Sequence, residues 1–273
     1  MYKNIFPSFF ALVVSVLLLS SCQNNPETGS EPALVIPAPP TLDFQLVNVY
    51  PHDTSSYTQG LIWEKGNLME GTGEYGKSLL RINALKTGQA IKTIALPSTD
   101  FGEGITVLNN KIYQLTWQEH KIYVYDATTY KLIKTADWPY EGWGITHNGE
   151  QLIISTGGSN IYFVRPETFT IQQTIGVNDN NGYVDSINEL EFAKGYIYAN
   201  RYMTDMILKI NPKNGEVVAR IDASKLLALA NAPFDPRQAD AGNVLNGIAF
   251  RTDNGHFYLT GKKWPVLVEA ILP

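Results

Sequence analysis

Short runs in which apolar and polar residues alternate occupy the chain from residue 42 onward. Clear examples are residues 111–115, 121–125 and 196–199. Alternation with a period of two is typical of half-buried antiparallel β-strands. Turn residues separate the runs, and pairs such as Asn109-Asn110 favour two-residue hairpins. The pattern predicts an all-β protein, with one short helix within residues 223–231.

The strands are grouped into larger units that repeat. Each unit starts with a polar or aromatic residue, followed by Gly (in one unit by Glu189) and then by Leu or Ile. The starts are Gln59, Glu103, Trp143, Asn188 and Asn246, with spacings of 44, 40, 45 and 58 residues. Repeats of ~40–50 residues with four strands each are typical of β-propellers. We therefore predict a five-bladed β-propeller, because the alternative, a β-sandwich, gives no reason for a motif at constant phase.

The last repeat is too short to complete a blade. It starts at Asn246 and reaches Pro273 after about three strands. An incomplete blade would leave an open sheet edge, which proteins avoid. Residues 42–50 form an unassigned strand at the other end of the repeats. We expect this N-terminal strand to complete the fifth blade and close the ring.

The N-terminus has the layout of an export signal. An apolar run at residues 5–19 follows Lys3 and is shorter than the ~20 residues of a spanning helix. It ends in Leu19-Ser20-Ser21-Cys22, which resembles the lipobox of bacterial lipoproteins. The resemblance implies a lipoprotein signal peptide at residues 1–21 and lipidation at Cys22, with an ordinary signal peptide as the alternative.

The residues after Cys22 predict how the propeller is attached. Residues 22–41 are rich in Asn, Pro, Gly, Ser and Glu, which is typical of a flexible tether, and the propeller domain occupies residues 42–273. By analogy with lipoproteins, Gln23 favours the outer membrane. We therefore expect a lipid-anchored protein of the cell envelope, on its periplasmic or surface face.

Composition excludes several other classes. The apolar content of 44% and the net charge of −5 exclude a disordered chain and argue against nucleic acid as a partner. A single cysteine excludes a disulfide framework, and four scattered histidines leave little for a transition-metal site. The sequence gives no sign of an oligomer, and we expect a monomer.

The repeat predicts where the chemistry lies. The first strand of each propeller blade lines the central channel, so the five starting residues should form a ring. The second strands of three units end at Trp117, Tyr202 and Lys262. Together these positions would place one acid, one lysine, several amides and several aromatic rings at one mouth of the channel, as in a small-molecule site.

Seven short segments between Tyr50 and Leu272 carry a more specific signal. They are Tyr50-Pro51-His52-Asp53, Tyr57-Thr58-Gln59-Gly60-Leu61, Phe101-Gly102-Glu103-Gly104, Gly142-Trp143-Gly144, Ile187-Asn188-Glu189-Leu190-Glu191, Val244-Leu245-Asn246-Gly247-Ile248-Ala249 and Thr260-Gly261-Lys262-Lys263-Trp264-Pro265. In this order they resemble the glutaminyl-peptide cyclotransferases of the plant and bacterial type. The resemblance implies a five-bladed propeller that converts N-terminal glutamine of peptides to pyroglutamate and releases ammonia.

The resemblance also implies residue roles. Glu103 matches the general acid/base, and Gln59, Asn188 and Lys262 match the polar catalytic residues of the pocket. The implied substrate-binding residues are Phe101, Trp117, Trp143, Tyr202, Asn246 and Tyr57. This chain has Tyr57 where plant members carry Phe and Tyr202 where they carry Trp, which bears on substrate preference.

Several points stay open at the level of sequence. We expect the pKa of Glu103 to be raised by its aromatic surroundings, unless Lys262 lies close enough to oppose the shift. No cofactor or catalytic metal is required, although a structural calcium ion in the channel is compatible with the sequence. His52 and Asp53 are expected to form a turn. The alternatives to an enzyme of this family are a propeller that only binds peptides or partners, and a calcium-dependent propeller hydrolase.

Overall fold

The structure, a computed structural model, describes residues 37–273. The expected signal peptide, the expected lipidation site Cys22 and residues 22–36 of the expected tether lie outside the described residues. Between residues 37 and 273, no helix has the length and apolar character needed to cross a membrane.

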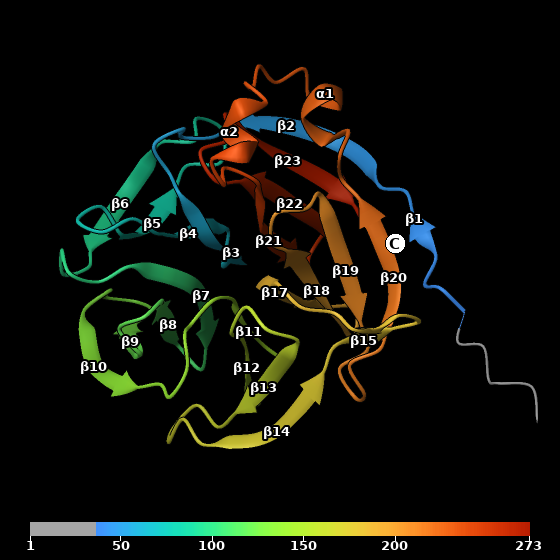
Figure 1. Ribbon diagram of the computed structural model, residues 1–273. Coiled ribbons are helices and arrows are strands. Elements are labelled where there is room, and N and C mark those ends of the chain that lie inside the picture. The colour runs from blue at the N-terminus through green and yellow to red at the C-terminus, as the bar shows by residue number, and fades with distance from the viewer. Residues whose placement is uncertain (1–36) are drawn as a thin grey trace, which may run out of the picture. The chain divides into compact units, whose positions relative to one another are not determined.

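The described chain is a five-bladed β-propeller, as the repeat predicted (Figure 1). The first blade contains β3 (Thr58–Glu64), β4 (Asn67–Thr72), β5 (Leu79–Asn83) and β6 (Ala90–Ala95). The second contains β7 (Gly102–Leu108), β8 (Lys111–Thr116), β9 (Lys121–Asp126) and β10 (Leu132–Asp137). The third contains β11 (Ile145–His147), β12 (Leu152–Ser155), β13 (Asn160–Val164) and β14 (Ile171–Gly176). The fourth contains β17 (Ile187–Ala193), β18 (Tyr196–Arg201), β19 (Met206–Ile210) and β20 (Val217–Asp222).

The fifth blade combines the two ends of the described chain. It contains β21 (Leu245–Arg251), β22 (His256–Gly261), β23 (Val266–Ile271) and the N-terminal strand β2 (Gln45–Pro51). β2 pairs antiparallel with β23 over its whole length, which confirms the predicted ring closure. A further strand, β1 (Thr41–Leu42), pairs in parallel with β20 of the fourth blade. β1 therefore begins one residue inside the stretch that was expected to be a tether.

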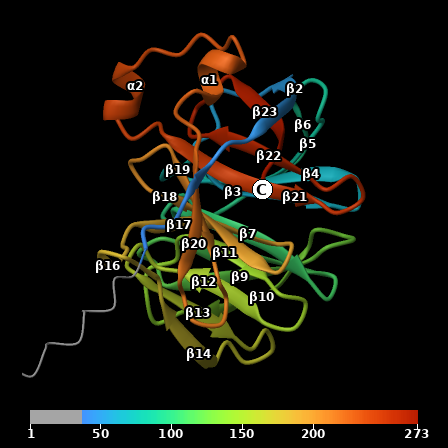
Figure 2. The same ribbon diagram turned by 90° about the vertical axis from the view of Figure 1, so that its right-hand side faces the viewer.

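Three small elements lie outside the blades. The expected helix is α1 (Leu226–Leu229), and a second helix, α2 (Arg237–Asp240), follows in the same insertion. Figure 2 shows both helices standing beside the fifth blade. A hairpin of β15 (Asn178–Asp179) and β16 (Gly182–Tyr183) precedes the fourth blade. Neither α2 nor this hairpin has a hydrophobic pattern of its own, so the sequence did not predict them.

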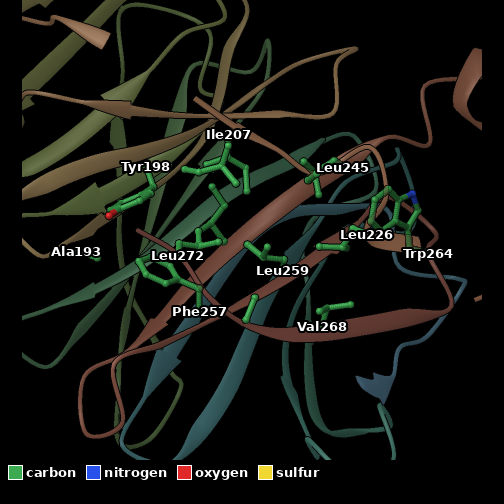
Figure 3. Close-up of a cluster of buried hydrophobic side chains, with 14 residues drawn as sticks. Ala193, Tyr198, Ile207, Leu226, Leu245, Phe257, Leu259, Trp264, Val268 and Leu272 are labelled. Atoms are coloured by element: carbon green, nitrogen blue, oxygen red, sulfur yellow. The ribbon is translucent and has the colours of Figure 1, made fainter. Parts of the chain in front are cut away.

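Five clusters of buried apolar side chains fill the spaces between neighbouring blades. In one of them, Tyr198 and Ile207 of the fourth blade meet Leu245 and Phe257 of the fifth (Figure 3). Burial of a large apolar side chain stabilises the fold by about 1.5–3 kcal/mol. Because each cluster draws side chains from two blades, the packing stabilises the ring as a whole.

Two glutamates of β17 connect blades across the centre. Glu189 accepts hydrogen bonds from the backbone N–H groups of Leu61 (3.2 Å) in the first blade and Ile248 (2.8 Å) in the fifth. Glu191 accepts one from the N–H group of Phe250 (2.8 Å), and burial raises its pKa to about 8. These contacts satisfy inner-strand N–H groups that would otherwise be unpaired.

A buried ion pair lies where β2 leads into the first blade. Both ring nitrogens of His52 face acceptors, because Nδ1 lies 2.8 Å from the carbonyl oxygen of Trp264 and Nε2 lies 3.1 Å from Glu70 Oε1. Two acceptors require two donors, so His52 is an imidazolium ion. Asp53 begins the turn that follows, as expected, and its carboxylate pairs with Arg81 at 2.7 Å.

The surroundings of His52 set its titration. Burial alone would lower the pKa of His52, but the charge of Glu70 and the hydrogen bonds to Glu70 and Trp264 raise it above its ordinary value of 6.5. The ion pair therefore contributes stability that is fully present below about pH 6.5 and is lost as pH rises through the folded-state pKa. The described chain offers an internal comparison, because burial lowers the pKa of His147 at the end of β11.

We predict that the two histidines titrate on opposite sides of pH 6.5. NMR of the imidazole resonances should give a midpoint above 6.5 for His52 and below 6.5 for His147. The reason is that Glu70 compensates for burial only at His52. A His52 midpoint below that of His147 would contradict the assigned ion pair.

Candidate active site

One cavity of about 220 Å³ lies at the mouth of the channel where the inner strands begin. All five blades contribute to its lining. The lining residues are Tyr57, Gln59, Phe101, Glu103, Trp117, Trp143, Asn188, Tyr202 and Lys262. The structure therefore brings together nine of the ten residues that the sequence suggested for the pocket, and Asn246 is the exception.

Irregular strand pairing directs the polar side chains into this cavity. The register of three inner strands shifts at the residue that starts the repeat, namely Gln59, Glu103 and Asn188, and all three side chains line the cavity. The corresponding shift in β21 leaves Asn246 outside the lining. Such β-bulges turn a side chain out of the regular alternation of a strand. In these three blades the repeated motif therefore places a polar side chain at the channel mouth.

Glu103 is the acid of the cavity. The residue is 4% exposed, and its Oε1 accepts a hydrogen bond of 3.0 Å from Gln59 Nε2. Burial raises the pKa of Glu103 well above its ordinary value, while the charge of Lys262 opposes the shift and the charges of Glu141 and Glu119 reinforce it. The raised pKa agrees with the expectation from sequence, and Lys262 does not reverse it.

Lys262 is the cation of the cavity. Its Nζ lies between two aromatic rings, 4.7 Å from the ring centre of Tyr57 and 4.6 Å from that of Tyr202. Burial lowers the pKa of Lys262 to about 8, although the charge of Glu103 opposes this shift. Its neighbour Lys263 instead pairs with Glu74 at 2.7 Å. Both rings attract the ammonium group through cation–π interaction, which holds it at the cavity.

The hydrophobic walls are rings packed edge to face. Phe101 contacts Trp117 with ring centres 5.6 Å apart, and Trp143 contacts Tyr202 at the same distance. Tyr57 meets Phe101 at 6.2 Å. These rings surround the carboxyl group with apolar surface, which is the cause of its desolvation.

Asn246 lies beneath the cavity and contacts Gln59. Its side chain is fully buried, and its Nδ2 donates to the carbonyl oxygen of Thr58 (2.9 Å) and to Gln59 Oε1 (3.2 Å). Because a carbonyl oxygen only accepts, the orientation of the Asn246 amide is fixed. Gln59 Oε1 must then accept, so Gln59 Nε2 faces Glu103. Asn246, which was expected to bind substrate, does not line the cavity but donates to Gln59, which does.

Two carboxylates outside the cavity were missed at the level of sequence. Glu141 accepts hydrogen bonds from the indoles of Trp117 and Trp143, and Glu119 accepts one from the backbone N–H of Phe101. Both stand in loops without periodicity, and only their position next to cavity residues could have indicated them.

Within residues 37–273, no group of three or more His, Cys, Asp or Glu side chains is arranged to hold a metal ion.

A propeller with an acid, an ammonium group and aromatic walls at one channel mouth has the architecture of an enzyme that acts on a small polar group. The sequence profile of the glutamine cyclotransferase family matches residues 13–272. The glutaminyl-peptide cyclotransferase of Arabidopsis thaliana is 34% identical over 232 residues, which are 84% of this chain and 71% of the plant protein. The crystal structure of Myxococcus xanthus glutaminyl cyclase has a TM-score of 0.78 and 34% identity, covering 85% of this chain and 97% of that chain. The chain belongs to the glutamine cyclotransferase family.

We predict that Asn246→Ala lowers kcat about 3- to 10-fold, because Gln59 loses the donor that fixes its orientation. Kinetics with an N-terminal glutaminyl dipeptide would measure the effect. Asn200→Ala is a matched control, since Asn200 is equally buried but its Oδ1 accepts only from the backbone N–H of Gly247. An equal loss of kcat in both variants would contradict the role of Asn246.

Proposed function

We propose that this chain converts the N-terminal glutamine of peptides and proteins to pyroglutamate and releases ammonia, with Glu103 as the proton shuttle. The observation that carries the proposal is the buried Glu103 carboxyl group, which has one oxygen bound to Gln59 and faces an aromatic cavity shared with Lys262. Membership of the glutamine cyclotransferase family supports the same reaction.

The cavity suits a single side chain. Its volume of about 220 Å³ is below the ~300–1,000 Å³ of pockets for drug-sized ligands. The rings of Phe101, Trp117 and Trp143 would contact the aliphatic part of the glutamine and select a folded-back rotamer. Because nucleophile and electrophile belong to one residue, this orientation can supply about 7–11 kcal/mol in the best intramolecular cases.

The proton is moved by one carboxylate oxygen. The α-amine nitrogen of the substrate attacks the carbon of its own side-chain amide, which forms the ring bond and an oxyanion. Gln59 occupies Oε1 of Glu103, so Oε2 takes the proton that the attacking nitrogen loses. Oε2 then gives this proton to the departing amide nitrogen, the C–N bond breaks, the carbonyl re-forms and ammonia leaves.

Two nitrogen donors that line the cavity can serve the oxyanion. Gln59 Nε2 already donates to Glu103, so we assign the oxyanion to Lys262 Nζ and the amide of Asn188. Among residues 37–273, Oδ1 of Asn188 is buried without a hydrogen-bond partner, and such an atom is costly unless a ligand satisfies it. A bound substrate amine or amide would supply the missing partner.

The setting of the enzyme is also part of the proposal. We place it at the cell envelope, anchored by lipid at Cys22, with the propeller on the periplasmic or surface face of the outer membrane. It acts as a monomer on N-termini that reach the channel mouth, and it needs neither a cofactor nor nucleic acid. The lipobox-like segment Leu19-Ser20-Ser21-Cys22 supports the anchor.

We predict a bell-shaped pH profile of kcat and its loss in Glu103→Gln. Activity should fall at low pH, because protonation of Glu103 removes the base, and above about pH 8, because Lys262 loses its charge. Glu103→Gln should lower kcat by about 10²- to 10⁴-fold and abolish the acidic limb. Ammonia release from a glutaminyl dipeptide measures both effects.

The exposed Glu150 in the turn after β11 offers the matched control Glu150→Gln, for which we expect unchanged kinetics. Full turnover by Glu103→Gln would remove the proton shuttle from the account. Binding of the dipeptide without ammonia release by the unaltered protein would instead favour a propeller that only binds peptides.

A further inference from the structure

We propose that Glu141 is a positioning residue that holds the two tryptophan walls of the cavity in their working orientation. This inference rests on the proposed cyclotransferase function and adds to it a residue that lies outside the cavity lining. One oxygen of Glu141, Oε2, accepts hydrogen bonds from Trp117 Nε1 at 2.9 Å and from Trp143 Nε1 at 3.1 Å.

The location of Glu141 allows this double contact. It stands in the connection between β10 of the second blade and β11 of the third, whereas Trp117 follows β8 and Trp143 precedes β11. The next residue, Gly142, donates its N–H to the carbonyl oxygens of Thr116 (3.1 Å) and Trp117 (3.2 Å). A Cβ on Gly142 would lie 2.6 Å from the carbonyl oxygen of Thr116, so a side chain there would force the connection away from β8.

The two hydrogen bonds to Glu141 fix the orientation of the Trp117 and Trp143 rings. An indole has a single donor at the edge of its ring, so fixing Nε1 fixes which face the ring presents to the cavity. The edge-to-face contacts of Phe101 with Trp117 and of Tyr202 with Trp143 complete the arrangement. Without Glu141, each indole would keep its ring contacts but lose the bond that sets its rotation.

The state of Glu141 fits the role. Burial alone would raise its pKa, but the hydrogen bonds from Trp143, Gln118 and Trp117 hold it below its ordinary value. Glu141 is therefore a carboxylate at neutral pH and forms charge-assisted hydrogen bonds, which are about twice as strong as neutral ones. Its charge also acts on Glu103, so a test must separate position from charge.

Two conservative variants make that separation. Glu141→Gln keeps an acceptor oxygen at the same reach and removes the charge, and Gln118 can rotate its amide to suit. Glu141→Asp keeps the charge but is one methylene shorter, so its carboxylate cannot reach both indoles. If Glu141 acts by positioning the indoles, Glu141→Gln should retain more activity than Glu141→Asp. If it acts only through its charge, Glu141→Asp should retain more activity than Glu141→Gln.

The experiment measures kinetics and indole signals on the full-length protein. With a glutaminyl dipeptide, we expect Glu141→Asp to lower kcat/KM about 5- to 100-fold, through both kcat and KM, because two rings lose their order. We expect Glu141→Gln to stay within about 3-fold of the unaltered protein. In substrate-free protein, the indole N–H resonances of Trp117 and Trp143 should shift in Glu141→Asp, and their protons should exchange with solvent faster than in Glu141→Gln. The resonances of Trp63 and Trp264 should not change in either variant.

The controls separate the outcomes. Glu119→Gln removes another charge that acts on Glu103 without touching an indole, so its indole resonances should not move. The inference would be overturned if Glu141→Asp were as active as Glu141→Gln or more active. Unchanged Trp117 and Trp143 resonances in Glu141→Asp would overturn it as well. If the proposed function is wrong, the unaltered protein will release no ammonia. The indole measurement tests the role of Glu141 independently of that result.

Discussion

Contact between inner-strand backbones at three glycines is the constraint on which the active site depends. A Cβ on Gly60 would collide with the backbone of Gly104 and Ile105, and one on Gly104 would lie 2.7 Å from the carbonyl oxygen of Trp143. Gly144 meets the backbone of Asn188 in the same way. Each glycine is the neighbour of a cavity residue, so the approach of the blades is also the convergence of Gln59, Glu103, Trp143 and Asn188.

The close approach of the blades brings Glu103 and Lys262 into one apolar cavity, where burial shifts the pKa of both groups. Burial raises the pKa of Glu103 and lowers that of Lys262, although each group opposes the shift of the other. Both shifts favour the neutral form of the group, because burial penalises the charged form. In the proposed reaction, the aromatic walls would contact the substrate and also exclude water from the carboxyl group.

Much of the fold could be predicted because it depends on local patterns in the sequence. The period of two gives the strands, the recurring motif gives the number of blades, and the incomplete last repeat gives the closure by β2 (Gln45–Pro51). The family resemblance then pointed to nine residues that line one cavity. These inferences need only neighbours in sequence or positions that repeat.

The remaining features depend on partners that the sequence does not bring together. Asn246 was expected to touch substrate, but a bulge in β21 directs it beneath Gln59, 187 residues away in sequence. The ion pair of His52 with Glu70 and the double contact of Glu141 likewise arise from packing of loops against other blades. Short pairings such as β1 with β20 carry too few residues to leave a pattern.

The protonation state of Glu103 tests the central claim most directly. Infrared difference spectra between the unaltered protein and Glu103→Gln, recorded as a function of pH, isolate the carboxyl band of this residue, because Glu189 and Glu191 contribute equally to both proteins. The account predicts a protonated carboxyl band that persists well above the pH at which a glutamate in water loses its proton, since burial raises the pKa of Glu103 well above 4.5. A band that disappears at about pH 4.5, as for a glutamate in water, would contradict it.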